Sequence, residues 1–153
     1  MEYSPLPSWL RMVREPLSAM ESDALIAGQG KIRSPKDTYN FLKGKLEAEL
    51  QEVFCVIALD TQSVVIAVHE ITRGILNASL IHPREVFAPA IVDRAAGIII
   101  AHNHPSGDPT PSSDDRACTR QLIEAGRVLD IPVYDHIILG QGRFISFAEA
   151  GLM

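Results

Sequence analysis

The sequence has few of the features that mark a secreted, membrane-embedded or disulfide-stabilised protein. It contains two cysteines in 153 residues, Cys55 and Cys118, and no CxxC pair, which argues against a disulfide framework and a cysteine-built zinc ribbon. No apolar run approaches the roughly 20 residues that cross a bilayer. The amino-terminal residues also lack the continuous apolar segment of a secretory signal. These absences predict a cytoplasmic protein with reduced core thiols and no membrane segment.

The chain also lacks an excess of positive charge. Its formal net charge is −5, whereas a free-standing nucleic-acid binder normally has a basic balance or a basic patch. A local basic face would still permit a nucleic-acid partner, but the overall charge does not support one. The oligomeric state cannot be predicted from these features.

Regular patterning is missing from the first part of the chain. Prolines at positions 5, 7 and 16 and the GQG at 28–30 interrupt any long period. We therefore predict an amino-terminal extension over residues 1–33, whose role the sequence does not reveal. A single compact domain is expected over residues 34–153, a length that suits one hydrophobic core.

From Ser34 onward the pattern predicts alternating helices and strands. Ser34 can cap a helix that begins with Pro35, and apolar residues follow on one face at Tyr39, Leu42, Leu46 and Leu50. The later elements are an antiparallel hairpin at 53–60 and 64–71, a helix from Pro83 with Val86, Phe87, Ala90 and Ile91 on its buried stripe, a strand at 97–104, a helix from 112 to about 128, and strands at 131–139 and 143–147. This order predicts an α/β domain, with a mixed sheet covered by helices on both faces.

Two histidines lie at the end of the predicted strand at 97–104. Side chains at i and i+2 of a strand share a face, so His102 and His104 can approach one ion while Asn103 points to the other side. Asp115 lies eleven residues beyond His104, in the first turn of the next helix. Two imidazole nitrogens and one carboxylate, with a fourth position for water, form the ligand pattern of catalytic zinc.

The same residues have a structural interpretation. Ser112 and Asp115 have the spacing of a capping box, in which the serine caps a helix and the residue three positions later completes the pair. Spacing alone leaves metal binding and helix capping equally open. Several hydrolase classes are excluded, however, because the chain lacks HxHxDH, is too short for a (β/α)8 barrel, and has no zinc-deaminase PCxxC.

The segment HNHPSGDPTPSSDD matches H-x-H-x7-S-x2-D, the JAMM signature of MPN-domain metallopeptidases. Together with LDTQSVVIAVHEITRGIL, HPREVFAPAI and DHIILGQGRFISFAEAGL, it resembles the bacterial RadC family over roughly residues 34–153. The resemblance implies a single-domain, three-layer α-β-α JAMM/MPN fold, which is cytidine-deaminase-like. Family members commonly carry an amino-terminal helix-hairpin-helix region, for which the roughly 30 residues here are too few.

The resemblance also implies roles for individual residues. His102, His104 and Asp115 would bind Zn2+, with water as the fourth ligand. Strand alternation allows only one of His69 and Glu70 to face the metal, and Glu70 is the better match to the family's general base. Ser112 would help to hold the tetrahedral oxyanion.

His136, with Asp135, would lie beside the ligands and support them, although a buried structural histidine is an equally good interpretation. The predicted activity is that of a zinc-dependent peptidase or isopeptidase, with a peptide or protein as substrate. The alternative is a non-catalytic accessory module of DNA repair or recombination that retains the metal. The sequence specifies neither the substrate nor the pathway.

Overall fold

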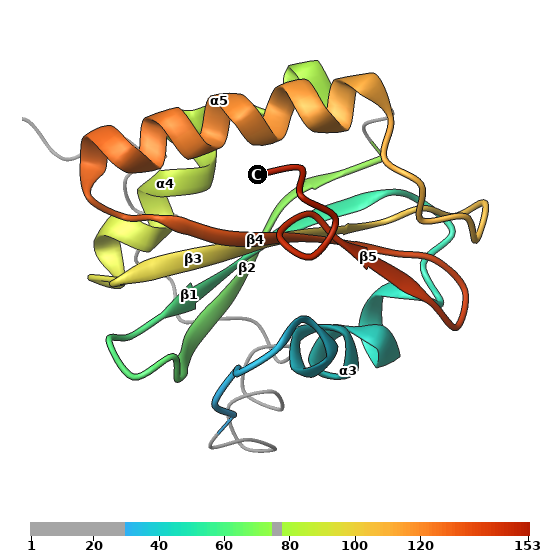
Figure 1. Cartoon of the computed structure of the whole chain (residues 1–153), viewed down its shortest axis with the longest axis horizontal. Helices are drawn as coiled ribbons and strands as arrows, with labels where there is room; N and C mark the ends of the chain where they lie inside the picture. Colours follow the sequence, from blue (N-terminus) through green and yellow to red (C-terminus); the bar gives the residue numbers. More distant parts are fainter. Residues whose placement is uncertain (1–29, 75–77) are drawn as a thin grey trace, which may run out of the picture.

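The computed structural model describes residues 30–74 and 78–153, which form a sheet between two helical layers (Figure 1). The elements are α3 (Pro35–Leu46), β1 (Val53–Leu59), β2 (Val65–Arg73), the short 3-10 helix η1 (Ala78–Leu80), α4 (Pro83–Val92), β3 (Gly97–Asn103), α5 (Ser113–Leu129), β4 (Val133–Leu139) and β5 (Phe144–Ser146). This architecture confirms the predicted α/β class and the mixed sheet covered on both faces.

The five strands lie in the order β2-β1-β3-β4-β5. β1 is antiparallel to both of its neighbours, so the start of β1 lies beside the end of β3, with Phe54 opposite His102. β3 and β4 are parallel and are connected through α5, as a parallel pair requires a crossover. The carboxyl end of β3 therefore meets the beginning of β1 and the amino end of α5.

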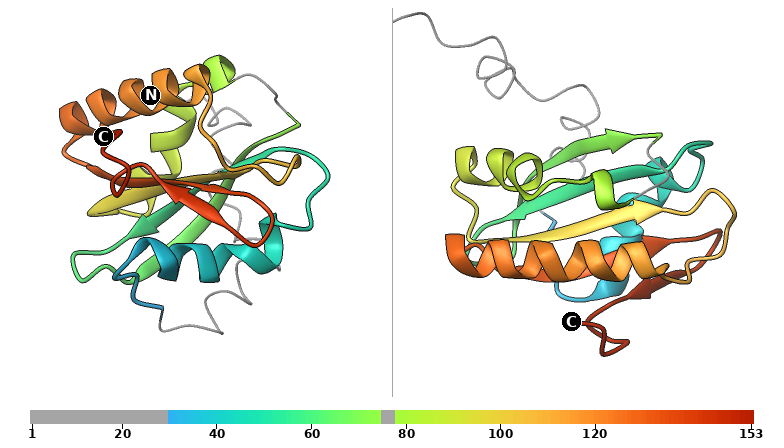
Figure 2. Two further views of the ribbon diagram at one scale, coloured as in Figure 1. Left: turned by 45° about the vertical axis from the view of Figure 1, so that its right-hand side comes forward. Right: turned by 90° about the horizontal axis from the view of Figure 1, so that it is seen from above.

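Alternation along the strands divides the core into two parts. Side chains such as Phe54, Val56 and Ile100 face α4 and α5, whereas Cys55, Ile57 and Ala101 face α3. Figure 2 shows α4 and α5 next to each other on one side of the sheet and α3 on the other. Both cysteines are buried and free, as expected for core thiols.

Several details differ from the sequence expectations. Leu50 was predicted on the buried face of the first helix, but α3 ends at Leu46 and Leu50 is 94% exposed. Ile91, predicted on a buried stripe, is 52% exposed, and it lies in the last turn of α4. Most of the predicted extension lies outside the described residues. Its last part already contacts the domain, since Lys31 forms a β-bridge with Val64 and Ile32 is buried.

Within the described part of the chain, no helix has the length and apolarity needed to cross a membrane.

Candidate metal centre

His102 and His104 lie at the carboxyl end of β3 and face α5. Their Nε2 atoms are 3.0 Å apart. His102 is almost completely buried and His104 is partly accessible. Asn103 projects to the opposite face, where its amide contacts the backbone of residues 51 and 53. Strand alternation therefore aims both imidazoles at one place, as the i, i+2 spacing predicted.

Asp115 approaches the histidines from the first turn of α5. Its Oδ1 lies 3.3 Å from Nε2 of His102, and its Oδ2 lies 3.3 Å from Nε2 of His104. Asp115 also completes a capping box: its backbone N–H donates to Ser112 Oγ, and its Oδ2 accepts from the Ser112 N–H. The two interpretations of Asp115 are thus compatible, because the capping geometry itself directs the carboxylate toward the histidines.

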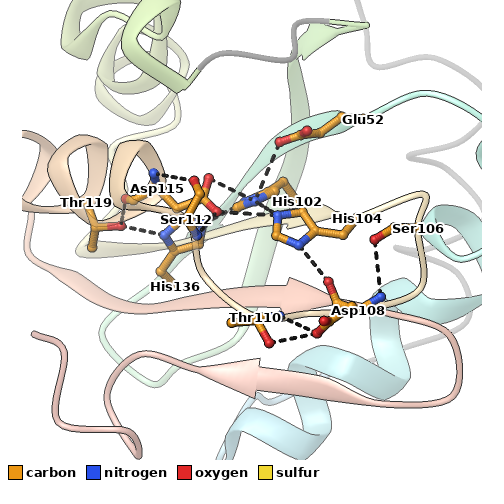
Figure 3. A network of polar contacts seen from close by, with 10 residues as sticks. All are labelled: Glu52, His102, His104, Ser106, Asp108, Thr110, Ser112, Asp115, Thr119 and His136. Carbon is orange, nitrogen blue, oxygen red and sulfur yellow. Dashed lines mark hydrogen bonds and ion pairs between the residues drawn. The ribbon is translucent and has the colours of Figure 1, made fainter.

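Glu52, the residue just before β1, adds a fourth side chain to this group (Figure 3). Its Oε1 lies 3.6 Å from Nε2 of His102. One ligand atom from each of Glu52, His102, His104 and Asp115 lies within 4.8 Å of the other three. Glu52 lies here because β1 is antiparallel to β3, so that the start of β1 is beside the end of β3. Glu52 is two residues before Phe54 and shares its face of the strand, and Phe54 stacks on His102.

The structure does not bring Glu70 to this group, which corrects its expected position. Glu70 lies opposite Cys55, and Cys55 belongs to the core on the α3 side of the sheet. The Glu70 carboxylate accepts two hydrogen bonds from Arg73, at 2.8 and 3.0 Å. His69, on the other face of β2, contacts Asp93, which caps the carboxyl end of α4, so neither residue of the pair reaches the two histidines.

Hydrogen bonds behind the histidines determine which ring nitrogens carry protons. Nδ1 of His104 lies 2.8 Å from the Asp108 carbonyl, which only accepts, so this nitrogen carries the proton. Thr119 donates its single hydroxyl proton to the Asp115 carbonyl and must therefore accept from Nδ1 of His136. The unprotonated Nε2 of His136 then accepts from Nδ1 of His102, 2.8 Å away.

This arrangement requires a neutral His136, and its surroundings favour that form. Burial lowers the pKa of His136 well below its ordinary value, and the neighbouring His102 adds to this effect. Phe147 stacks on one side of the ring, and Phe54 packs against it edge-on. The apolar surroundings thus keep His136 in the form that accepts a hydrogen bond from His102.

The donor set fits a zinc ion. When His102 and His104 are neutral, with the proton on Nδ1, their Nε2 lone pairs point toward each other and toward the carboxylate of Asp115. Such a cluster of electron pairs is stabilised by a cation among them. Tetrahedral zinc with bonds of about 2.0–2.1 Å needs donor atoms about 3.3 Å apart, close to the spacings of 3.0 and 3.3 Å found here.

The electrostatics of the carboxylates agree with a cation site. Burial by itself would raise the pKa of Asp115, but protonated Nε2 atoms of His102 and His104 outweigh it and hold that pKa far below its ordinary value, and a cation in place of those protons would act in the same direction. Asp115 therefore favours its ionised form more strongly than an exposed aspartate does. Burial raises the pKa of Glu52, although the two histidines oppose the shift, so this carboxyl group takes up a proton more readily than an exposed glutamate.

Asp135 and His136 have different surroundings despite being adjacent. His136 contacts His102 directly, as described above. The Asp135 carboxylate accepts hydrogen bonds from Ser146 Oγ, from the Ala148 N–H and from the N–H of His136. Asp135 therefore fixes the turn after β5 and the backbone of β4, and its side chain does not touch the His136 ring.

A depression of about 260 Å3 lies on the α3 side beside the group, with walls formed by residues 46–50, 103–105, 107 and 139–141. His104 is the member of the group that lines it.

The Thr119 hydroxyl provides a test of the proton arrangement. We expect Thr119→Val to weaken zinc binding about 10- to 100-fold, the usual cost of losing a group that orients a metal ligand. The reason is that valine keeps the shape but leaves the Nδ1 proton of His136 without an acceptor. Competition with a chromophoric chelator measures the affinity. Thr119→Ser retains the hydroxyl and should bind like the wild type. Equal affinities for the valine and serine variants would contradict the arrangement.

Fold and site together define a class: an α/β domain with a His-His-Asp-Glu group, able to hold a metal ion, at the carboxyl end of a central strand. Comparison with known proteins specifies the family. Residues 32–152 match the RadC-like JAB domain, and this chain belongs to that family.

The chain is also similar to several curated proteins that carry the name UPF0758 protein. It is 49% identical over 125 residues to one from Clostridium perfringens, covering 82% of this chain and 55% of the relative. It is 43% identical over 123 residues to one from Methanosarcina mazei, covering 80% and 54%. A relative from Geobacter sulfurreducens is 40% identical over 144 residues, covering 94% and 63%. The chain therefore spans between half and two thirds of the length of these relatives.

Proposed function

We propose that this domain is a zinc-dependent hydrolase that cleaves a peptide or isopeptide bond. The observation that carries the proposal is the convergence of Glu52, His102, His104 and Asp115 at one strand end, in a domain of the RadC-like JAB family. A zinc ion held there would activate water and polarise the carbonyl of the scissile bond. The substrate partner is accordingly a peptide or protein.

In this proposal Glu52 is the general base, in place of Glu70. Its carboxylate lies beside His102 and its pKa is raised by burial. It can accept a proton from the attacking water and return it to the leaving nitrogen. Glu70 is held by Arg73 on the other face of the sheet. It therefore lies away from the two histidines and cannot accept the proton of a water bound between them.

Ser112 is suited to the second catalytic role. Its Oγ accepts a hydrogen bond from the Asp115 N–H, which leaves the hydroxyl proton free to be donated. The side chain is exposed at the start of α5, next to the metal group. A hydrogen bond from this hydroxyl to the carbonyl oxygen of the substrate would strengthen as that oxygen becomes negative. Capping and catalysis thus use different atoms of one hydroxyl group.

The proposal is tested by an activity profile of the zinc-loaded protein. Peptides, lysine isopeptides and DNA are offered in parallel, and we expect hydrolysis of an amide substrate but not of DNA. Chelation of zinc and the Asp115→Ala substitution should each remove the activity, because both remove the metal. If a protein with one zinc per chain cleaved no amide substrate in the profile, the hydrolase assignment would be rejected.

A second candidate function is a non-catalytic accessory module associated with DNA repair or recombination. The observation that favours it is a groove lined by α5 and by residues 151–153, which contains Arg116, Arg120 and the pair of Arg127 with Glu124, a local excess of positive side chains on an acidic chain. Glu52 is also near enough to act as a fourth zinc ligand, which would close the coordination sphere as in structural sites. DNA binding with a steep salt dependence, without amide hydrolysis, would favour this function.

A further inference from the structure

Asn103 separates the two histidines in sequence, but its side chain lies on the opposite face of β3 and is 2% exposed. Both ends of its amide are used. Oδ1 accepts a hydrogen bond from the Val53 N–H at 2.7 Å, and Nδ2 donates to the Gln51 carbonyl at 2.9 Å. The two backbone groups that Asn103 holds are therefore those on either side of Glu52.

The backbone around Glu52 has little other support from β3. The pairing of β1 with β3 extends only to Phe54, opposite His102. Beyond that pair, the amide of Asn103 takes the place of a peptide group and continues the hydrogen bonding between the two strands for two more residues. On the other side, Gly74 N–H donates to the Glu52 carbonyl, which ties the same segment toward β2.

The position of the Glu52 carboxylate depends on this backbone. The carboxylate approaches Nε2 of His102 to 3.6 Å, and a contact of this length does not fix the side chain by itself. A shift of residues 51–53 toward β2 would carry the carboxylate away from the two histidines. Asn103, anchored between those histidines in sequence, opposes that shift.

We propose that Asn103 is a positioning residue that holds Glu52 at the metal group. The inference rests on the proposed function, in which Glu52 is the general base beside the bound ion; its negative charge there also favours binding of the cation. Asn103, the middle residue of the H-x-H segment, then has a role of its own. His102 and His104 present nitrogens on one face of β3, and Asn103 aligns Glu52 from the other face. Ligand spacing and glutamate placement are then set by three consecutive residues.

The test is a double-substitution cycle with zinc affinity as the readout. Asn103→Leu removes both hydrogen bonds at similar size, and Glu52→Gln removes the charge that Asn103 is proposed to place. We expect Asn103→Leu to weaken zinc binding about tenfold in the wild-type background. The same substitution should have little further effect in the Glu52→Gln background. An equal loss in both backgrounds would mean that Asn103 supports the domain in general, and would overturn the inference.

Two additions make the cycle decisive. If Asn103→Leu does not fold, Asn103→Asp replaces it, since it keeps the acceptor for Val53 but sets an oxygen against the Gln51 carbonyl; the same cycle pattern is expected. Hydrogen exchange of the Val53 amide should quicken in Asn103→Leu, which removes its acceptor, and unchanged exchange in that variant would also overturn the inference. Glu49→Gln, an acidic neighbour paired with Arg73, serves as the charge control and should leave zinc affinity unchanged.

The cycle separates this inference from the proposed function. Wild-type protein that binds no zinc would overturn both. Wild-type protein that binds zinc and hydrolyses an amide, with an additive cycle, would overturn only the role of Asn103.

Discussion

Glu52→Gln is expected to reduce amide hydrolysis by about 10²- to 10⁴-fold, the range for removing a general acid–base. Glutamine has the same shape but cannot accept the proton of the attacking water. The zinc content should stay near one per chain, because His102, His104 and Asp115 remain in place. The loss should appear mainly in kcat, measured with the best substrate from the activity profile.

Glu70→Gln is the matched control for this result. It removes a carboxylate of the same kind from a nearby strand, on the face of the sheet that α3 covers. Its partner Arg73 also pairs with Glu49, so the domain should remain folded and the turnover should stay close to that of the wild type. A large loss for Glu70→Gln combined with normal turnover for Glu52→Gln would reverse the assignment of the base.

His104→Ala is expected to weaken zinc binding about a hundredfold or more, because structural zinc sites bind with roughly 10–16 kcal/mol shared among about four ligands. Affinity is measured by competition with a chelator at fixed pH. Thermal unfolding gives an independent readout. Free zinc at 100 times its dissociation constant stabilises a folded protein by about 2.7 kcal/mol. For a domain of this size that corresponds to a rise in Tm of about 5–10 °C.

The same zinc concentration should leave the Tm of His104→Ala nearly unchanged. His69→Ala is the control, since it removes another partly buried histidine, which contacts Asp93 away from the metal group. That variant should lose some stability but keep the full rise in Tm with zinc. If zinc stabilised His104→Ala as much as the wild type, the ion would have to bind somewhere else.

Much of the fold and part of the site follow from local rules. The period of the strands and the Ser34 and Ser112 caps predicted element types and approximate bounds. The i, i+2 relation of His102 and His104 and the capping box of Asp115 are also local, so three members of the group could be predicted together. Leu50 was misplaced because apolar spacing alone does not reveal where a helix ends; the structure ends α3 four residues earlier.

Glu52 could not be found in this way, because its position depends on which strands pair and in what register. It lies 50 residues before His102 in the sequence, and the strand that follows it is antiparallel to β3. A prediction that placed β1 beside β3 would have put the residue before β1 next to the histidines. The contact of Thr119 with His136 is similarly non-local, since it joins α5 to β4 across the core.

The capping box of α5 has a consequence for how the metal enters. Asp115 is held in place by its hydrogen bonds to Ser112, and both histidines are oriented through their Nδ1 atoms. These hydrogen bonds thus order the ligand side chains when the protein folds, before any ion binds. In the proposed function zinc is then an exchangeable component of a finished scaffold: a chelator should strip it and added zinc restore it without a refolding step, unlike in small zinc fingers, which unfold when the ion leaves.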